Sequence, residues 1–66
     1  MIRRARRQWQ QIDANTPPHT EVRTPYSTEL ATFFGLVNGQ AQVRYETDRP
    51  GVFDLIDPAM VLEENR

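Results

Sequence analysis

The sequence of 66 residues contains no cysteine and no lysine. Without cysteine, the chain has no disulfide framework, no thiolate nucleophile and no thiolate ligand for a metal. Arginine supplies all eight basic side chains, which suits bidentate recognition of carboxylates or phosphates but is also what a GC-rich genome produces. No apolar stretch approaches the roughly 20 residues of a membrane-spanning helix, so we expect no membrane contact.

The charges are unevenly distributed along the chain. Residues 1–23 hold five arginines and two carboxylates, whereas residues 24–66 hold three arginines and seven carboxylates. The arginines near the N-terminus could begin a signal peptide, but Gln8-Trp9-Gln10-Gln11 follows instead of an apolar stretch. We therefore expect a cytoplasmic protein.

The length allows one structural domain with a thin margin of stability. Small domains without disulfides or metals often gain stability from a partner or from self-association. We expect a basic amphipathic helix over residues 1–15 and a small β-barrel-like domain over residues 19–63.

The N-terminal helix is predicted from spacing. Ile2, Ala5, Trp9 and Ile12 recur at intervals that place apolar side chains on one stripe of a helix. Arginines at a helix N-terminus oppose the macrodipole, and a helix this short is marginal alone. The helix should therefore dock on the domain or on another chain through Trp9 and Ile12.

The dipeptide Asn38-Gly39 predicts a hairpin of residues 32–37 and 40–46. A two-residue turn pairs Leu36 with Ala41, Phe34 with Val43 and Thr32 with Tyr45. Phe33 and Val37 then face away from that apolar side. Residues 25–34 remain ambiguous between a helix that begins at Pro25 and a strand.

The remaining elements complete a mostly β chain. Residues 19–24 and 52–56 are expected to be extended, and Asp57-Pro58-Ala59-Met60 to form a 3₁₀ turn capped by Asp57. Val61-Leu62 should form a last short strand.

The order of strand, hairpin, strand, 3₁₀ turn and final strand resembles that of a small SH3-like barrel. The resemblance lies in Gly51-Val-Phe-Asp-Leu-Ile-Asp-Pro-Ala-Met-Val-Leu62, which looks like the closing part of such barrels. The expected fold is therefore an SH3-like barrel or a strongly bent antiparallel sheet with the N-terminal helix docked on it. Such a fold implies little about activity.

No pattern in the sequence indicates catalysis, a metal site or a cofactor. His19 is the single histidine and lacks fixed partners in its neighbourhood. Glu46, Asp48, Asp54 and Asp57 surround one end of the hairpin, but turn and cap roles account for Asp48 and Asp57. We therefore expect a protein that is not an enzyme.

Two surfaces are candidates for binding. The apolar residues that we expect at a protein interface, unless the helix covers Phe33 and Val37, are Trp9, Ile12, Tyr26, Phe33 and Val37. The alternative is a nucleic-acid-binding arm formed by Arg3, Arg4, Arg6 and Arg7. The leading expectation is a protein-binding module or accessory subunit that binds a partner or itself as a homo-oligomer.

Overall fold

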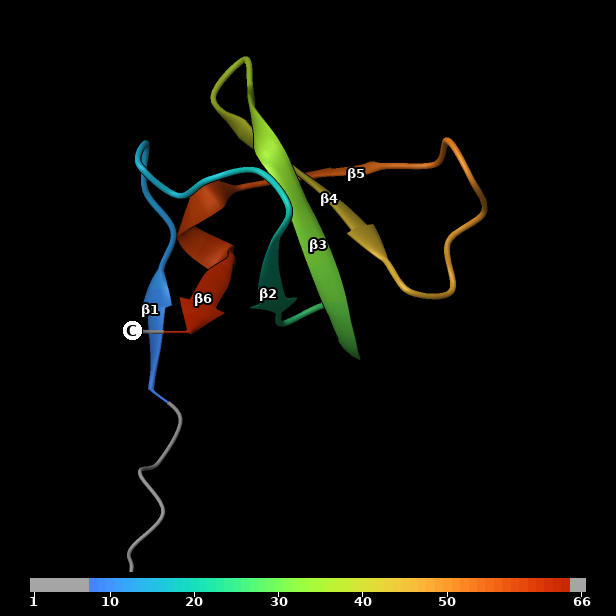
Figure 1. Ribbon diagram of the computed structural model, residues 1–66, viewed down its shortest axis with the longest axis horizontal. Helices are drawn as coiled ribbons and strands as arrows, with labels where there is room; N and C mark the ends of the chain where they lie inside the picture. Colours follow the sequence, from blue (N-terminus) through green and yellow to red (C-terminus); the bar gives the residue numbers. More distant parts are fainter. Residues whose placement is uncertain (1–7, 65–66) are drawn as a thin grey trace, which may run out of the picture.

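The computed structural model describes residues 8–64 as one antiparallel sheet (Figure 1). The strand order across this sheet is β1-β6-β2-β3-β4-β5. The elements, in chain order, are β1 (Trp9–Gln11), β2 (Thr20–Thr24), β3 (Ser27–Val37), β4 (Gln40–Tyr45), β5 (Asp54–Ile56), the 3₁₀ helix η1 (Pro58–Met60) and β6 (Leu62–Glu64).

The C-terminal strand β6 joins the N-terminal strand to the rest of the sheet. β6 pairs on one side with β1, where Leu62 lies opposite Gln11, and on the other with β2, where Glu63 lies opposite Val22. Strands β2 to β5 follow one another as a meander. The first and last parts of the described chain therefore lie side by side (Figure 1).

The expected fold class, an N-terminal helix docked on a small SH3-like barrel or strongly bent sheet, is wrong. Residues 8–15 contain no α-helix, and Trp9–Gln11 forms strand β1. A helix this short is only marginally stable by itself. Pairing with β6 instead gives the backbone of this segment hydrogen-bond partners in a sheet. After β1 the Asn15 N–H donates to Asp13 Oδ1 at 2.7 Å, which favours a turn over a helix. The part of the expected helix before residue 8 lies outside the described residues.

Both tight turns of the meander follow from local chemistry. Asn38 and Gly39 have φ values of 50° and 79°, as the predicted two-residue turn requires, and Val37 pairs with Gln40 across it. Thr24 pairs with Ser27 across Pro25-Tyr26, so residues 27–34 belong to β3. The helical alternative for residues 25–34 is therefore excluded.

A β-bulge changes the register of the β3–β4 hairpin away from its turn. Leu36 pairs with Ala41 as predicted, but the register shifts between Phe33 and Gly35. Beyond the shift Phe33 lies opposite Val43, and Ala31 opposite Tyr45. The predicted pairs Phe34–Val43 and Thr32–Tyr45 are wrong because the bulge adds a residue to β3.

The bulge places Phe33 in the core and Phe34 on the opposite face. The buried apolar side chains form one layer, which contains Ile12, Val22, Ala31, Phe33, Ala41, Val43, Tyr45, Ile56 and Val61. Phe33 is 1% exposed and is among the largest fully buried side chains of the described residues. Phe34 instead makes edge-on ring contacts with His19 at 5.2 Å and Phe53 at 5.1 Å.

The C-terminal part follows the sequence closely. Asp57 caps η1, since its Oδ1 accepts a hydrogen bond from the Ala59 N–H at 3.0 Å, which confirms the predicted 3₁₀ turn. The strand expected over residues 52–56 is shorter and begins at Asp54. Within residues 8–64, no helix is long and apolar enough to cross a membrane.

Replacing each of the two adjacent phenylalanines by alanine should test the bulge. We expect Phe33→Ala to lower the free energy of unfolding by about 3–5 kcal/mol, because it empties a filled core position. Phe34→Ala should cost clearly less, because Phe34 is only half-buried. Urea unfolding followed by circular dichroism measures both, and a larger loss for Phe34→Ala would contradict this register.

Gly35 in the bulge has φ +129°, in the region that favours glycine. A Cβ at this position would meet no atom within 4 Å, so the cost of substitution comes from the backbone alone. We expect Gly35→Ala to destabilise the fold by about 1–3 kcal/mol. Gly39→Asn is the matched control, because asparagine tolerates the left-handed turn conformation. Equal stability of Gly35→Ala and the parent chain in urea unfolding would argue against the bulge.

Candidate functional site

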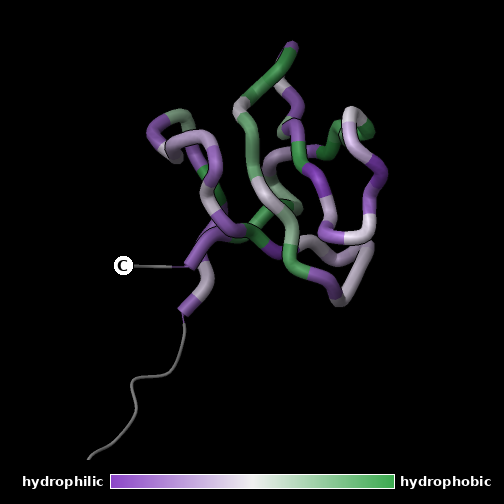
Figure 2. Tube along the Cα trace, turned by 45° about the vertical axis from the view of Figure 1, so that its right-hand side comes forward, coloured by the Kyte–Doolittle hydropathy of each residue, from purple (hydrophilic) through white to green (hydrophobic). Residues whose placement is uncertain are grey.

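The residues expected at a protein interface do not form one surface in the structure. Ile12 is 3% and Phe33 1% exposed, so both belong to the core. Trp9 is half-buried, and the Arg23 guanidinium lies 5.2 Å above its ring centre. Val37 is exposed at the end of β3, a hydrophobic stretch that precedes the hydrophilic tip of the β3–β4 hairpin (Figure 2), while Tyr26 lies on the β2–β3 turn.

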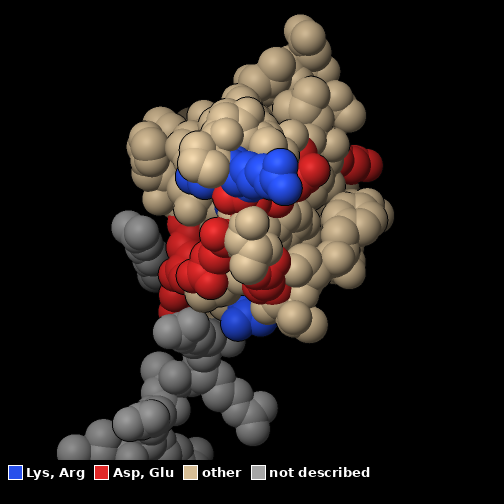
Figure 3. Space-filling view, turned by 90° about the vertical axis from the view of Figure 1, so that its right-hand side faces the viewer, with Lys and Arg blue, Asp and Glu red and all other residues tan. Residues whose placement is uncertain are grey.

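The charged side chains of the described residues are mainly acidic. Arg3, Arg4, Arg6 and Arg7, the proposed nucleic-acid arm, lie outside the described residues. Residues 8–64 hold three arginines and nine carboxylates, a formal balance of −6. Figure 3 shows carboxylates gathered on one face. This surface therefore attracts cations more readily than phosphates.

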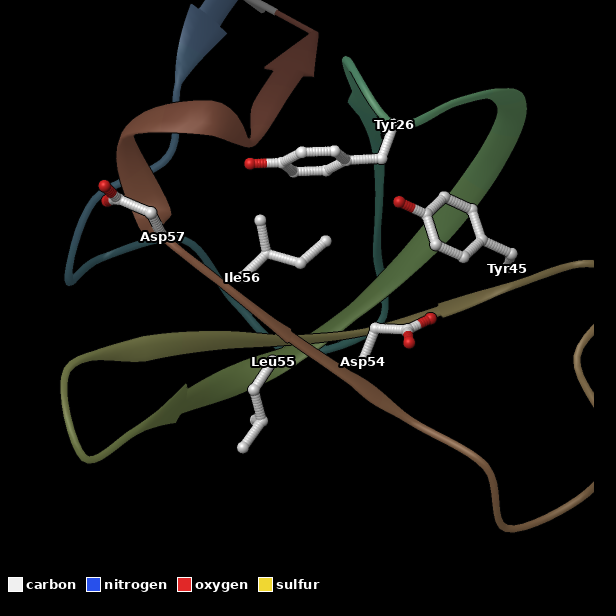
Figure 4. Close-up of a pocket in the computed structure, with 6 residues that line it drawn as sticks. All are labelled: Tyr26, Tyr45, Asp54, Leu55, Ile56 and Asp57. Carbon is white, nitrogen blue, oxygen red and sulfur yellow. The ribbon is translucent and has the colours of Figure 1, made fainter.

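An open pocket of about 340 Å³ combines aromatic rings with carboxylates. We call it the Tyr–Asp pocket, and its lining residues are Tyr26, Tyr45, Asp54, Leu55, Ile56 and Asp57. Figure 4 shows the Tyr26 ring above Ile56 and the Tyr45 ring beside it, while Leu55 points to the other side of β5. The two tyrosines come from the β2–β3 turn and the end of β4, whereas Asp54 begins β5 and Asp57 directly follows it.

The end of β4 is held by the loop that follows it. The Asp48 side chain accepts a hydrogen bond from the Tyr45 N–H at 2.9 Å, and the Asp48 N–H donates to the Tyr45 carbonyl at 3.0 Å. Arg44 Nη2 donates to the Asp48 carbonyl at 3.0 Å. Asp48 thus has the turn role expected from the sequence, and it positions Tyr45 at the pocket.

A buried threonine connects the two tyrosines. Thr24 is 8% exposed, and its hydroxyl is hydrogen-bonded to the Tyr45 hydroxyl. The same Thr24 oxygen accepts a hydrogen bond from the Tyr26 N–H at 3.3 Å. One side chain at the end of β2 therefore orients the Tyr45 ring and the turn that carries Tyr26.

The two carboxylates of the pocket differ in their partners. Asp57 uses Oδ1 to cap η1. Within residues 8–64, no hydrogen bond or ion pair engages the half-buried Asp54 carboxylate. A cationic side chain in the pocket would find acceptor oxygens beside two aromatic rings, which is the combination that binds guanidinium and ammonium groups.

An apolar groove lies next to the Tyr–Asp pocket. Its volume is about 400 Å³, and it is lined by Arg23, Thr24, Pro25, Ala59, Met60 and Leu62. Met60 and Leu62 are 44% and 37% exposed. Pro25 and Tyr26 are adjacent in the β2–β3 turn, so this turn contributes one wall to the groove and one to the pocket.

Sequence reasoning identified one residue of the pocket as an interface residue, Tyr26. It missed Tyr45 and interpreted Asp54 and Asp57 as structural, since their proximity to the tyrosines arises from pairing between distant strands. The pair Val43–Asp54 brings β5 beside β4, and a correct β4–β5 register would have revealed the pocket. In the described part of the chain, no group of three or more His, Cys, Asp or Glu side chains could hold a metal ion.

Removing the Thr24 hydroxyl should test its connecting role. We expect Thr24→Val to lower the free energy of unfolding by about 1–3 kcal/mol, because the Tyr45 hydroxyl loses its partner. Thr28→Val, at an exposed position of β3, is the matched control and should change stability by less than about 0.5 kcal/mol. Urea unfolding measures both, and equal stability of the two variants would refute the connecting role.

Comparison with known proteins supplies no template for this surface. No family model matches the sequence, no curated protein matches it, and no solved structure matches the fold. The function must therefore be inferred from the pocket, the groove and the charges of the chain itself.

Proposed function

We propose that this chain is a non-enzymatic, cytoplasmic protein-binding module whose Tyr–Asp pocket receives a basic side chain of a partner protein. The observation that carries the proposal is that two tyrosines and two aspartates line one open pocket. The partner is either a different protein, which makes the chain an accessory subunit, or a second copy.

The electrostatics of the domain support a basic partner. The formal balance over residues 8–64 is −6, although the five arginines outside them bring the whole chain to −1, so the attraction of a positively charged segment is local to the acidic surface. Inside the pocket, Asp54 offers a carboxylate that no described residue engages, and Tyr26 offers a ring that is 65% exposed. The acidic balance of the described residues and the groups in the pocket therefore favour the same kind of ligand.

The aromatic rings make the pocket more selective than an acidic patch. An arginine guanidinium can stack on a tyrosine ring while it donates to a carboxylate in a bidentate manner. Ile56, 8% exposed, also lines the pocket and would contact the aliphatic part of the entering side chain. Arginine and lysine both have a basic head and an aliphatic stem, but only arginine adds planar stacking and bidentate donation.

A nucleic-acid function is the alternative, and it would depend on Arg3, Arg4, Arg6 and Arg7. The acidic balance of the described residues opposes phosphate binding, so such contacts would be confined to the N-terminal arginines. A single-stranded oligonucleotide provides the direct comparison. Binding of the oligonucleotide without binding of a basic peptide would favour this alternative over the proposed function.

Replacing Asp54 by asparagine should weaken the binding of a basic peptide. We expect a fluorescein-labelled peptide of alternating arginine and glycine to bind the full chain, and Asp54→Asn to raise its Kd about fivefold, or about 1 kcal/mol. Fluorescence anisotropy measures the Kd, and the effect should shrink at high salt.

The control for this experiment changes the net charge by the same amount at another place. Glu21→Gln lies at an exposed position of β2 and outside the residues that line the pocket, so it should leave the Kd within about twofold. Equal weakening by Glu21→Gln and Asp54→Asn would show that only the net charge attracts the peptide. Equal binding of a peptide with glutamate in place of arginine would refute the proposal altogether.

A further inference from the structure

The Tyr–Asp pocket and the apolar groove have no lining residue in common, but residues close together in the sequence line both. The β2–β3 turn contributes Tyr26 to the pocket and Pro25 to the groove. The segment after β4 contributes Asp57 to the pocket and Met60 to the groove, with η1 between β5 and β6. The two depressions are therefore lined by neighbouring residues of the same two segments.

Short-range hydrogen bonds hold the two segments that line the pocket and the groove. The Met60 N–H donates to the Asp57 carbonyl at 2.9 Å, and the Val61 N–H donates to the Pro58 carbonyl at 3.1 Å. On the other wall, Thr24 is bonded to both tyrosine-bearing segments and also lines the groove. A ligand that contacts both depressions would therefore meet a surface that is already ordered, which lowers the entropic cost of binding.

The pocket and the groove carry opposite charges. The pocket carries Asp54 and Asp57, whereas the groove carries Arg23, whose guanidinium lies over the Trp9 ring. A basic side chain is attracted to the pocket and repelled by Arg23. The groove, with Met60 and Leu62 partly exposed, suits an apolar side chain.

We propose, building on the function proposed above, that the partner presents one extended segment with a basic side chain in the Tyr–Asp pocket and an apolar side chain in the groove. The charge complementarity of the pocket, and the neighbouring residues of the β2–β3 turn and of the segment around η1 that line pocket and groove, identify this occupant. Burying the apolar side chain against Met60 and Leu62 supplies affinity that an exposed ion pair lacks.

The test uses three kinds of labelled peptide against the full chain: one with a single arginine, one with a single leucine, and a series with both. In the series, one to four glycines separate the two side chains. We expect the best member of the series to bind about tenfold more tightly than the arginine peptide, as partial burial of a leucine would produce. Fluorescence anisotropy measures each Kd.

Two variants test whether the gain in affinity of the two-residue peptide comes from the groove. Met60→Gln should remove most of the advantage of the two-residue peptide and leave the Kd of the arginine peptide unchanged. Val52→Gln is the matched control, because Val52 is 45% exposed, similar to Met60 at 44%, and lines neither depression. Unchanged urea unfolding of both variants confirms that any loss of binding is local.

The outcomes separate this inference from the proposed function. Equal binding of the arginine and two-residue peptides at every spacing, with Asp54→Asn still harmful, would overturn the inference and leave the proposed function standing. Binding of none of the peptides would overturn both. Light scattering of the free chain should show a monomer at the assay concentration. A dimer lost in Met60→Gln would instead assign the groove to a second copy and overturn the inference.

Discussion

The inward orientation of Phe33 is the constraint on which the rest of the structure depends. A sheet with a single buried layer has few large side chains to fill it, and Phe33 is the largest fully buried one among the described residues. The β-bulge that turns Phe33 inward also places Ala31 opposite Tyr45. The small alanine side chain leaves space for the tyrosine ring, whose hydroxyl reaches Thr24. The core and the wall of the Tyr–Asp pocket thus follow from the same shift in register.

The features that local chemistry determines could be predicted from the sequence, whereas those that depend on distant pairing could not. Asn38-Gly39 favours a type I′ turn because both residues tolerate positive φ values, and Asp57-Pro58 begins a 3₁₀ turn by capping. Strand β1, by contrast, exists because β6 offers a partner from the other end of the chain. Its apolar spacing also fits a helix, and tertiary pairing outweighs that weak local preference. The bulge was missed although Gly35 was a signal for it, since a glycine within a strand often marks a bulge.

The candidate site was harder to predict from the sequence than the fold, because it also depends on pairing between distant strands. Tyr26 follows a proline in a turn, and an exposed aromatic side chain at such a position indicates an interface residue. Tyr45 ends a strand and looks like an ordinary core residue, which its 9% exposure partly confirms. Only the pairing of β4 with β5 brings the aspartates to these rings. A residue such as Tyr45 can therefore pack in the core and also line the pocket, and the sequence pattern indicates only its place in the core.

The division between pocket and groove matches the different strengths of the forces involved. Exposed ion pairs contribute about 0–1 kcal/mol each, so carboxylates at an open pocket select a ligand and orient it more than they retain it. Apolar burial depends on area and is insensitive to salt, but it distinguishes poorly between partners. A domain of 66 residues offers little surface for either force alone. In the proposed binding mode, Asp54 and Asp57 in the pocket and Met60 and Leu62 in the groove would combine both forces, and the positive charge of Arg23 would determine which end of a ligand enters which depression.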